Sequence, residues 1–435
     1  MHDHPTTLSQ VRLGPVTLHG VTVILRPPRI DDYPRWRRIR LHDRRYIEPF
    51  WSSSPLDWTA RHSGKHWVHE CLAGRADARA ARRLPLVIEV DGRFSGQIEL
   101  DHIDVGTGSA EMGLWMHSAV ARLGIGGLAT ALMLDFGFGE AGLQRITAPI
   151  SPANAATAGG AAQLGFQREA TMTRYFDVGG APRDHELWAV TAAAMPPEGF
   201  AAQWIRRRDG RSSGDAPQTT TVCEDRPLTR VEVLGAIARY HAGRIRHLAD
   251  PLRRPYRIRL TDPENPAVVA RCRRLTDRVP RQAAWLRLSS NSAVPESVHG
   301  QGADRVRWVR ELFRTWPGLC SAPGLVLAVQ IDGEYAGEIR LFEADLFNRH
   351  ARVDGWIDPG LAGQRLRVAA TRLVVDYAFT TLGLVRIATA IEPDDIDAAE
   401  VAALVGMVRE GRMRDFVGVT GHRADHDLWA VTTPR

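Results

Sequence analysis

Three glycines within four residues mark the stretch ARLGIGGLATAL at residues 121–132. A predicted strand ends before this stretch, and a predicted helix begins in it. Gly124, Gly126 and Gly127 have no Cβ atoms, and the first N–H groups of a helix have no intrahelical partner. The pattern therefore predicts a cradle in which backbone N–H groups and the helix dipole hold a phosphate or pyrophosphate. A tight turn with a glycine-assisted helix start is the alternative.

Two common nucleotide motifs do not fit this stretch. No Lys-Ser or Lys-Thr pair follows the last glycine, as a P-loop requires, and the Gly-x-Gly-x-x-Gly spacing of a dinucleotide site is missing. We therefore expect no mononucleotide hydrolysis.

A long internal repeat indicates how the chain is organised. DHELWAVT at residues 184–191 returns as DHDLWAVT at residues 425–432, which is 425 − 184 = 241 residues later. Further matches at this offset are Asp135 with Asp376, Phe138 with Phe379, Arg145 with Arg386, Ile146 with Ile387, Arg168 with Arg409, and Glu169 with Glu410. A one-residue slip also aligns GWI from Gly355 with GLW from Gly113. The period is far above solenoid lengths, so we predict two copies of one domain.

Composition is that of an ordinary globular protein. The chain has 435 residues, with 44% apolar and 24% charged residues. Its net charge of +6 comes from arginines scattered among acidic residues without interleaved aromatics, which argues against nucleic-acid binding. No apolar run approaches a membrane span and the N-terminus lacks signal-peptide features, so the sequence predicts a cytoplasmic protein. Without any Cys-x-x-Cys pair, the cysteines are predicted to be free thiols, and no metal site is expected.

Local patterns set the expected boundaries. Residues 1–195 are predicted to form the first domain, residues 196–227 a linker, and residues 228–435 a helix followed by the second domain. In that helix, Thr229 and Glu232 have capping-box spacing, and Val231, Leu234 and Ile237 should lie on one face.

The order of elements within one copy predicts a mixed sheet. Hairpins are expected around Asp91-Gly92 and Gly179-Gly180, and helices after Gly127 and from Asn154. Strands and helices in this order predict an α/β or α+β fold, with a parallel crossover near the middle and antiparallel hairpins at both ends.

Five motifs in this order resemble the GNAT acetyltransferases of the RimJ/RimL type, which acetylate protein N-terminal amines or related small amines. They are EMGLWM, GIGGLATAL, RITAPISPANAAT, QLGFQRE and RDHELWAV, and they cover most of residues 20–192. The resemblance implies two tandem GNAT folds and acetyl-CoA as co-substrate. It also implies that acetyl-CoA lies between the strands GLWM and RITAPI, which splay apart.

The resemblance carries specific residues with it. It places the pyrophosphate on Arg122, Leu123, Gly124, Ile125, Gly126 and Gly127, and the pantetheine arm and sulfur beside Asn154 and Thr157. The family's first loop position, often Gln or Arg, is Ala121 here, so Arg122 is expected to supply the charge.

The implied reaction is attack of a neutral amine on a thioester carbonyl. It needs a base, an oxyanion donor and a proton for the leaving thiolate. The backbone of Leu114, Trp115 and Met116 is the predicted oxyanion donor. Glu111 is the first candidate base, with a solvated strand-end carboxylate as the alternative. Tyr175 and Ser151 are candidate acids, for each of which a structural role is the favoured alternative.

Asp184 and His185 look like a catalytic pair but recur as Asp425 and His426. Because we predict that the second copy is inactive, we expect this pair to fix the last hairpin instead.

The second copy has lost the predicted cofactor contacts. At offset 241, Arg365, Arg367 and Val368 replace the three glycines, and Asp395 and Ala398 replace Asn154 and Thr157. The slipped alignment places Val353 opposite Glu111. We therefore predict that the first copy is catalytic and that the second is a structural partner or substrate-binding module. The second copy could imitate a second subunit within a monomer, or the protein could form a homodimer.

The predicted function is transfer of the acetyl group of acetyl-CoA to a primary amine by direct attack in a ternary complex. The acceptor is expected to be a protein N-terminal α-amine or a small-molecule amine. An acetyltransferase for an antibiotic or metabolite, and an acetyl-CoA-binding regulator without turnover, are the alternatives. Trp51 and Trp58 in EPFWSSSPLDW are expected to line the acceptor entrance.

Overall fold

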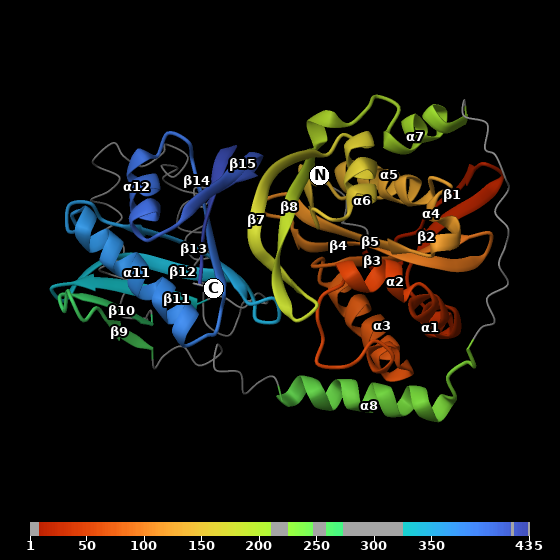
Figure 1. The fold of residues 1–435 in the computed structure, drawn as a ribbon, viewed down its shortest axis with the longest axis horizontal. Helices are drawn as coiled ribbons and strands as arrows, with labels where there is room; N and C mark the ends of the chain where they lie inside the picture. The colour runs from red at the N-terminus through yellow and green to blue at the C-terminus, as the bar shows by residue number, and fades with distance from the viewer. Residues whose placement is uncertain (1–7, 210–224, 247–257, 273–324, 419–421, 434–435) are drawn as a thin grey trace, which may run out of the picture. The chain divides into compact units, whose positions relative to one another are not determined.

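The computed structural model describes residues 8–209, 225–246, 258–272, 325–418 and 422–433 (Figure 1). The chain divides into two compact units. The first contains Met1–Glu169, Val178–Ala181 and His185–Ile245, and the second contains Ala170–Asp177, Pro182–Asp184 and Arg246–Arg435. We refer to the elements β1 to β8 as the first copy and to β9 to β16 as the second.

The first copy contains a mixed sheet in the order β1-β2-β3-β4-β5-β6-β8-β7. β5 and β6 pair in parallel, whereas the pairs β1–β2, β2–β3, β3–β4, β4–β5 and β6–β8 are antiparallel. The strands are β1 Leu13–Leu18, β2 Val21–Arg26, β3 Leu84–Val90, β4 Arg93–Asp104, β5 Ser109–Met116, β6 Arg145–Ile150, β7 Gln167–Val178 and β8 Ala181–Thr191. The predicted parallel crossover and the hairpins are confirmed.

Helices cover both faces of this sheet (Figure 1). One apolar cluster joins the sheet to α5 and α7, and another joins it to α1 and α3 on the opposite face. The helices are α1 Tyr33–His42, α2 Arg44–Ile47, α3 Gly64–Arg79, α4 Ser118–Ala121, α5 Ile125–Phe138, α6 Ala155–Gln163, α7 Phe200–Asp209 and α8 Arg230–Arg246.

Helix α7 lies where the sequence predicted the start of a linker. Phe200 and Trp204 are 3% and 4% exposed and belong to the α5 core cluster. Asp135 of α5 accepts hydrogen bonds from the N–H groups of Phe200 and Ala201 at 2.6 and 3.0 Å. Apolar residues one helical turn apart therefore extend the first copy to residue 209, and residues 210–224 lie outside the described part.

Helix α8 begins as predicted but packs differently. The Thr229 N–H donates to Glu232 at 2.8 Å, and the Glu232 N–H donates to Thr229 Oγ1 at 3.3 Å, which confirms the capping box. Val231 and Leu234, two of the apolar residues expected on one face, are 79% and 66% exposed, so that face is not the one that α8 buries. The backbone carbonyl of Ala236 contacts His69 Nε2 of α3 at 2.9 Å instead.

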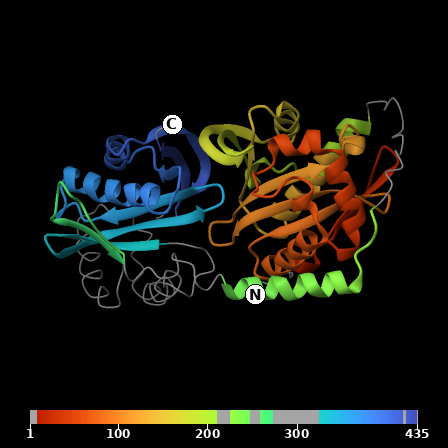
Figure 2. The ribbon, with the colours of Figure 1, turned by 60° about the horizontal axis from the view of Figure 1, so that its bottom comes forward.

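Figures 1 and 2 both show α8 alongside α3. Most of α8 therefore belongs to the first unit rather than to the second domain that it was expected to open.

The second copy repeats the sheet order as β9-β10-β11-β12-β13-β14-β16-β15, with β13 and β14 parallel. Figure 2 shows α11 lying across its strands. The elements are β9 Arg259–Thr261, β10 Val268–Cys272, β11 Leu325–Ile331, β12 Glu334–Asp345, β13 His350–Ile357, α11 Gln364–Thr380, β14 Arg386–Ile391, α12 Ile396–Leu404, β15 Val408–Val417 and β16 Arg423–Thr432.

Residues that repeat between the copies form the same internal contacts. Arg145 pairs with Glu169, and both side chains are at most 3% exposed. Arg386 pairs with Glu410 at 2.6 Å, with 2% and 6% exposure. These repeated residues therefore hold each sheet to its last hairpin.

The repeated aspartates act in the hairpin, as predicted. Asp184 accepts a hydrogen bond from the N–H of Arg174 at 2.9 Å, and Asp425 accepts one from the N–H of Asp415 at 3.3 Å. Arg174 and Asp415 have φ angles of 54° and 51°, a left-handed conformation at equivalent positions within β7 and β15. Each aspartate therefore stabilises the same bulge in its copy.

Two remaining sequence predictions concern membranes and thiols. Across the described ranges, no helix is both long and apolar enough to span a membrane. Cys71 is a buried free thiol, as predicted, whereas Cys223 and Cys320 lie outside the described residues.

Candidate active site

The two central strands of the first copy separate at one defined point. β5 and β6 pair only through Ser109–Glu111 and residues 145–147, and beyond these pairs the strands diverge. Pro149 lies in the diverging part of β6 and has no N–H group to leave unpaired. The second copy has Ala390 there and diverges after the same three pairs, so the proline is not the cause. The predicted splay is present in both copies.

Glu111 is the last paired residue before the strands separate. It is half-buried and lies opposite Thr147 of β6. Side chains alternate along a strand, so Glu111 and Gly113 face the same side as Trp115, which packs with the α1 and α3 cluster. Glu111 is thus at the closed end of the V-shaped gap, a suitable position for the predicted base.

The candidate acids lie elsewhere. Ser151 follows β6, about 13 Å along the strand from Thr147 at the usual rise per residue. Its carbonyl accepts a hydrogen bond from the Asn154 N–H at 2.8 Å and so helps to start α6. Tyr175 is on β7 in a segment that groups with the second unit, and its ring lies 4.5 Å from that of Phe176. Ser151 thus lies at the opposite end of β6 from the residue that pairs with Glu111, and Tyr175 belongs to the other compact unit.

The predicted oxyanion donor lies at the open edge of β5. Leu114 is 39% exposed and Met116 is half-buried. The Trp115 indole N–H donates to Gln97 Oε1 at 3.0 Å, so this side chain points into the protein and only its backbone lies at the edge. In the described structure this edge of β5 has no partner strand after Glu111.

Helix α5 begins beside this edge, as predicted. Gly124 is its N-cap, with a φ of 75° that favours glycine. The first intrahelical hydrogen bond runs from the Leu128 N–H to the Gly124 carbonyl at 3.0 Å, so the preceding N–H groups have no intrahelical acceptor. The Ile125 side chain is fully buried, and Leu123 packs against the same core. These two residues can therefore contact a ligand mainly through their backbones.

The glycines of this loop make room for protein atoms. A Cβ atom on Gly127 would lie 2.0 Å from the ring of Trp204, and one on Gly126 would lie 3.0 Å from Met116 Sδ. The Trp204 indole N–H also donates to the Gly124 carbonyl at 3.0 Å. The expectation that the missing Cβ of Gly127 leaves space for a ligand is therefore wrong, because α7 occupies that space.

Arg208 is a candidate that the sequence analysis missed. Its guanidinium carbon lies 4.3 Å from the Trp204 ring centre, and a Cβ on Gly124 would be 2.8 Å from Arg208 Nη1. The predicted cation, Arg122, is exposed two residues before Gly124. Two positive charges therefore flank the start of α5, where an anion is favoured. The apolar spacing of FAAQWIRRRD could have revealed the helix that carries Arg208.

Asn154 and Thr157 begin helix α6. Asn154 Oδ1 accepts a hydrogen bond from the Thr157 N–H at 3.2 Å, so Asn154 is the N-cap. Thr157 is exposed on the first turn. Both residues lie just beyond the diverging end of β6.

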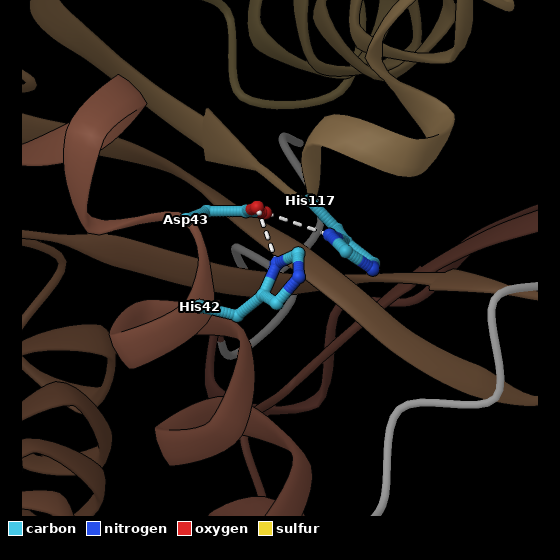
Figure 3. Close-up of side chains that lie close together, drawn as sticks. All are labelled: His42, Asp43 and His117. Carbon is cyan, nitrogen blue, oxygen red and sulfur yellow. Dashed lines mark hydrogen bonds and ion pairs between the residues drawn. The ribbon is translucent and has the colours of Figure 1, made fainter.

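A hydrogen-bond network around the buried Asp43 holds the segment between β5 and α5 (Figure 3). Asp43 follows α1, and its carboxylate contacts His117 Nδ1 at 2.6 Å and His42 Nδ1 at 2.9 Å. It also accepts hydrogen bonds from the Ser118 N–H at 2.8 Å and the Ser118 hydroxyl at 2.7 Å.

Burial alone would raise the pKa of the Asp43 carboxyl, but the donors from His117 and Ser118 lower it well below its usual range. The charged carboxylate thus ties α1 to the segment that leads into α4 and α5.

Polar atoms of His42, Asp43 and His117 lie within 4.8 Å of one another, a spacing that a metal ion could also use. Hydrogen bonds already engage both Asp43 oxygens, and the expectation of no metal site stays a prediction.

Comparison with known families decides the relationship. The acetyltransferase (GNAT) domain family matches residues 22–167 and 281–408, more than half of the chain. The chain belongs to the GNAT acetyltransferase family. The family matches twice, which confirms the tandem duplication deduced from the repeat.

Named relatives match parts of the chain. The putative ribosomal N-acetyltransferase YdaF of Bacillus subtilis is 32% identical over 105 residues, 24% of this chain and 56% of its own. The spermidine N(1)-acetyltransferase of Escherichia coli K12 is 31% identical over 93 residues, 21% of this chain and 50% of its own. The chain thus spans about half the length of these curated relatives.

Among solved structures, Mycobacterium smegmatis RimJ in complex with CoA-disulfide is 37% identical. That match covers 46% of this chain and 96% of RimJ, with a TM-score of 0.45.

The second GNAT domain aligns with the first without a slip. Gly96 pairs with Met116 in the first domain, and Gly337 pairs with Ile357 in the second, which keeps the offset at 241. The residue equivalent to Glu111 is therefore Arg352, and the alignment of Val353 with Glu111 is wrong. A match of three letters suggested the slip, whereas backbone pairing sets the register.

The second domain also begins its central helix differently. Helix α11 starts at Gln364 after Gly363, whose φ of −59° is not left-handed. Arg365 and Arg367 thus lie in its first turn, and Arg367 Nη2 is 3.7 Å from Asp397. Asp395 still caps α12 by accepting the Ala398 N–H at 2.9 Å.

Proposed function

We propose that the first GNAT domain transfers the acetyl group of acetyl-CoA to a primary amine by direct attack in a ternary complex. The acceptor is a protein N-terminal α-amine or a small-molecule amine. The V-shaped gap that opens at Glu111, beside the capped start of α5, is the observation that carries this proposal. A RimJ structure that contains CoA-disulfide supports it. Acetyl-CoA as the donor favours a cytoplasmic location.

In this proposal each side of the gap has a separate role. The backbone of residues 114–116 binds the pantetheine arm and the oxyanion, and residues 122–127 bind the pyrophosphate, with Arg208 as an additional cation. Asn154 and Thr157 face the thioester sulfur. Glu111 removes a proton from the amine, directly or through water, and Tyr175 or Ser151 returns one to the thiolate.

The acceptor's own pKa favours an α-amine. An N-terminal amine titrates near 8 and a lysine near 10.4, so the neutral form of lysine at neutral pH costs about 3 kcal/mol more. A single carboxylate at the end of the gap is better matched to an α-amine, which needs less free energy to reach its neutral form.

A thiol-release assay with N-terminal peptides and small amines tests the proposal. We expect CoA release that depends on the acceptor and falls in Glu111→Gln. An acetyl-CoA-binding regulator would bind acetyl-CoA without release, and an antibiotic or metabolite acetyltransferase would respond to small amines alone.

We further propose that the second GNAT domain binds no acetyl-CoA and serves as a structural partner or substrate-binding module. Arg352 at the base position and arginines in the first turn of α11 support this assignment. Val368 in place of Gly127 does not, because Gly127 accommodates Trp204. Light scattering would separate a monomer with two related halves from a homodimer.

A further inference from the structure

A buried arginine lies between tryptophan rings in the first GNAT domain. Arg40 of α1 is 3% exposed. Its guanidinium carbon is 3.7 Å from the ring centre of Trp51, 4.4 Å from that of Trp115 and 5.6 Å from that of Trp58. We call these four residues the Arg40 cage.

The charge of Arg40 is not neutralised by a neighbouring carboxylate. Its Nε and Nη1 atoms are buried without a hydrogen-bond partner, and the described residues contain no ion pair with Arg40. Glu70 and Glu99 act on it electrostatically, but Glu70 accepts from Gln97 at 2.7 Å and Glu99 pairs with Arg83.

A second cation adds positive charge near Arg40. The Arg61 guanidinium lies 5.2 Å from the Trp58 ring centre and donates to the Ser52 carbonyl at 2.8 Å. The pKa of Arg40 is lowered to about 9, mainly by burial and in smaller part by the charge of Arg61, while Glu70 and Glu99 oppose the change.

Burial also lowers the pKa of His62 to about 3, helped by the charge of Arg40, so this imidazole is neutral at physiological pH. The region is therefore rich in positive charge and apolar rings, and no carboxylate among the described residues hydrogen-bonds to the buried Nε and Nη1 of Arg40. Contacts with aromatic faces offset only part of the cost of burying an unpaired cation.

The cage lies on the face of β5 that the acceptor would use. Trp115 shares that face with Gly113 and Glu111, which are about 7 and 13 Å away along the strand. The loop that carries Trp51 is anchored to the β7–β8 turn, because Ser52 bridges to Val178 and Ser53 Oγ accepts the Gly180 N–H at 2.7 Å.

We propose that Arg40 binds an oxyanion, a carboxylate or a phosphate, that the acceptor carries in addition to its reacting amine. This proposal rests on the proposed function and specifies its acceptor class. The spacing from Gly113 to Trp115 corresponds to two residues of an extended peptide, so the anion lies near the third residue of a peptide acceptor. Nε and Nη1 have no exposed surface, so the half-buried Trp51 moves aside when the anion enters.

Acceptor peptides that differ only at the third residue test this assignment. Glutamate, phosphoserine and glutamine at that position separate a carboxylate, a phosphate and a neutral group. We expect kcat/KM for the better anionic peptide to exceed that for the glutamine peptide about tenfold, mainly through KM, as for one charge-assisted hydrogen bond. Equal values for all three peptides would overturn the proposal.

Substitution of Arg40 links the preference to this residue. Arg40→Met keeps the apolar stem and removes the charge, and we expect the ratio of anionic to neutral peptide to fall to about one. Arg40→Lys keeps a charge and should restore part of the preference. Arg38→Met, a change of an exposed residue on the same helix, is the matched control and should keep the wild-type ratio. A preference that survives Arg40→Met would refute the assignment.

Melting temperatures separate this proposal from the proposed function. If the wild type acetylates neither peptides nor small amines, the proposed function fails, yet the Arg40 assignment is still tested by binding. Acetate and inorganic phosphate should raise the melting temperature of the wild type and Arg38→Met, but not that of Arg40→Met.

The anion-free melting temperature tests the alternative that Arg40 is only a structural clamp. Because Arg40→Met removes an unpaired buried charge, it should melt no lower than Arg38→Met. A drop of several degrees would identify Arg40 as a clamp and reject the proposal.

Discussion

The two GNAT domains have the same strand order and register but differ where the central helix begins. In the first, left-handed Gly124 starts α5, and Trp204 and Arg208 pack against this turn. In the second, α11 starts at Gln364, two residues before the position equivalent to Ile125, and Arg365 is inside its first turn. The same strand register can therefore support two different helix starts, only one of which has the left-handed glycine.

Residues that are the same in both domains stabilise the fold, whereas residues that differ between the domains include those proposed to carry out the chemistry. The ion pair Arg145–Glu169 and the bulge bond to Asp184 recur in the second domain, where no base is present at the Glu111 position. The repeated sequence at residues 184–191 and 425–432, which first indicated the duplication, thus reflects the shared fold. The predictions below test this distinction.

The largest expected effect is on the buried ion pairs. Arg145→Met and Arg386→Met each remove the arginine that neutralises a buried glutamate, so each should lower the free energy of unfolding of its domain by about 3–5 kcal/mol. Denaturant unfolding measures this loss. Arg168→Met, which removes a mostly exposed arginine from its pair with Glu186, should cost less than about 1 kcal/mol. A large loss in only one domain would contradict the shared structural role.

The next effect separates the equivalent β5 and β13 positions. Glu111→Gln should reduce kcat about a hundredfold with little change in acetyl-CoA affinity, because only a proton acceptor is removed. Arg352→Gln should leave kcat unchanged. Steady-state thiol release and calorimetry provide the two readouts. Wild-type turnover by Glu111→Gln at saturating amine would reject Glu111 as the base.

A smaller effect distinguishes the two helix starts. Gly124→Ala forces a side chain into a left-handed position beside Arg208, so it should cost about 1–2 kcal/mol of stability and weaken acetyl-CoA binding. Arg365→Ala lies within a helix and should be nearly neutral. Calorimetry of the full chain should give one acetyl-CoA per chain, and two equivalent sites would show that the second domain is also competent.

The smallest expected effect concerns the helix caps. Asn154→Ala and Asp395→Ala should each cost about 1 kcal/mol, since each side chain caps its helix. Asn154→Asp keeps the cap, so it should preserve stability and lower only acetyl-CoA affinity, because it adds a negative charge beside the cofactor. Unchanged affinity in Asn154→Asp would remove Asn154 from the proposed cofactor site.

Local patterns were sufficient to predict the sheet and the start of α5. The Asp91-Gly92 turn has φ angles of 48° and 75°, and Gly179-Gly180 has 66° and 80°, as tight hairpin turns require. The splay and the fold followed from the family resemblance, because no periodicity in a single strand encodes where two strands separate.

Tertiary contacts explain what the sequence analysis missed. Helix α7 was hidden because its Phe200 and Trp204 precede a stretch rich in arginine, glycine and serine that resembles a linker. The buried face of α8 depends on α3, so the positions of Val231 and Leu234 could not be deduced from their spacing. Arg40 looked like an ordinary helical arginine, since only the assembled tryptophan cage buries it.

The divergence of β5 and β6 has a mechanical consequence. Each sheet consists of two blocks of strands joined at this seam by only three residue pairs. Amides beside the seam should therefore exchange with solvent through local opening more readily than those in the continuous blocks. A molecule that binds across the gap would hold the two blocks of strands together, and its binding free energy would oppose local opening at the seam. Hydrogen exchange along residues 109–116 and 350–357 would then compare how the two domains respond to acetyl-CoA.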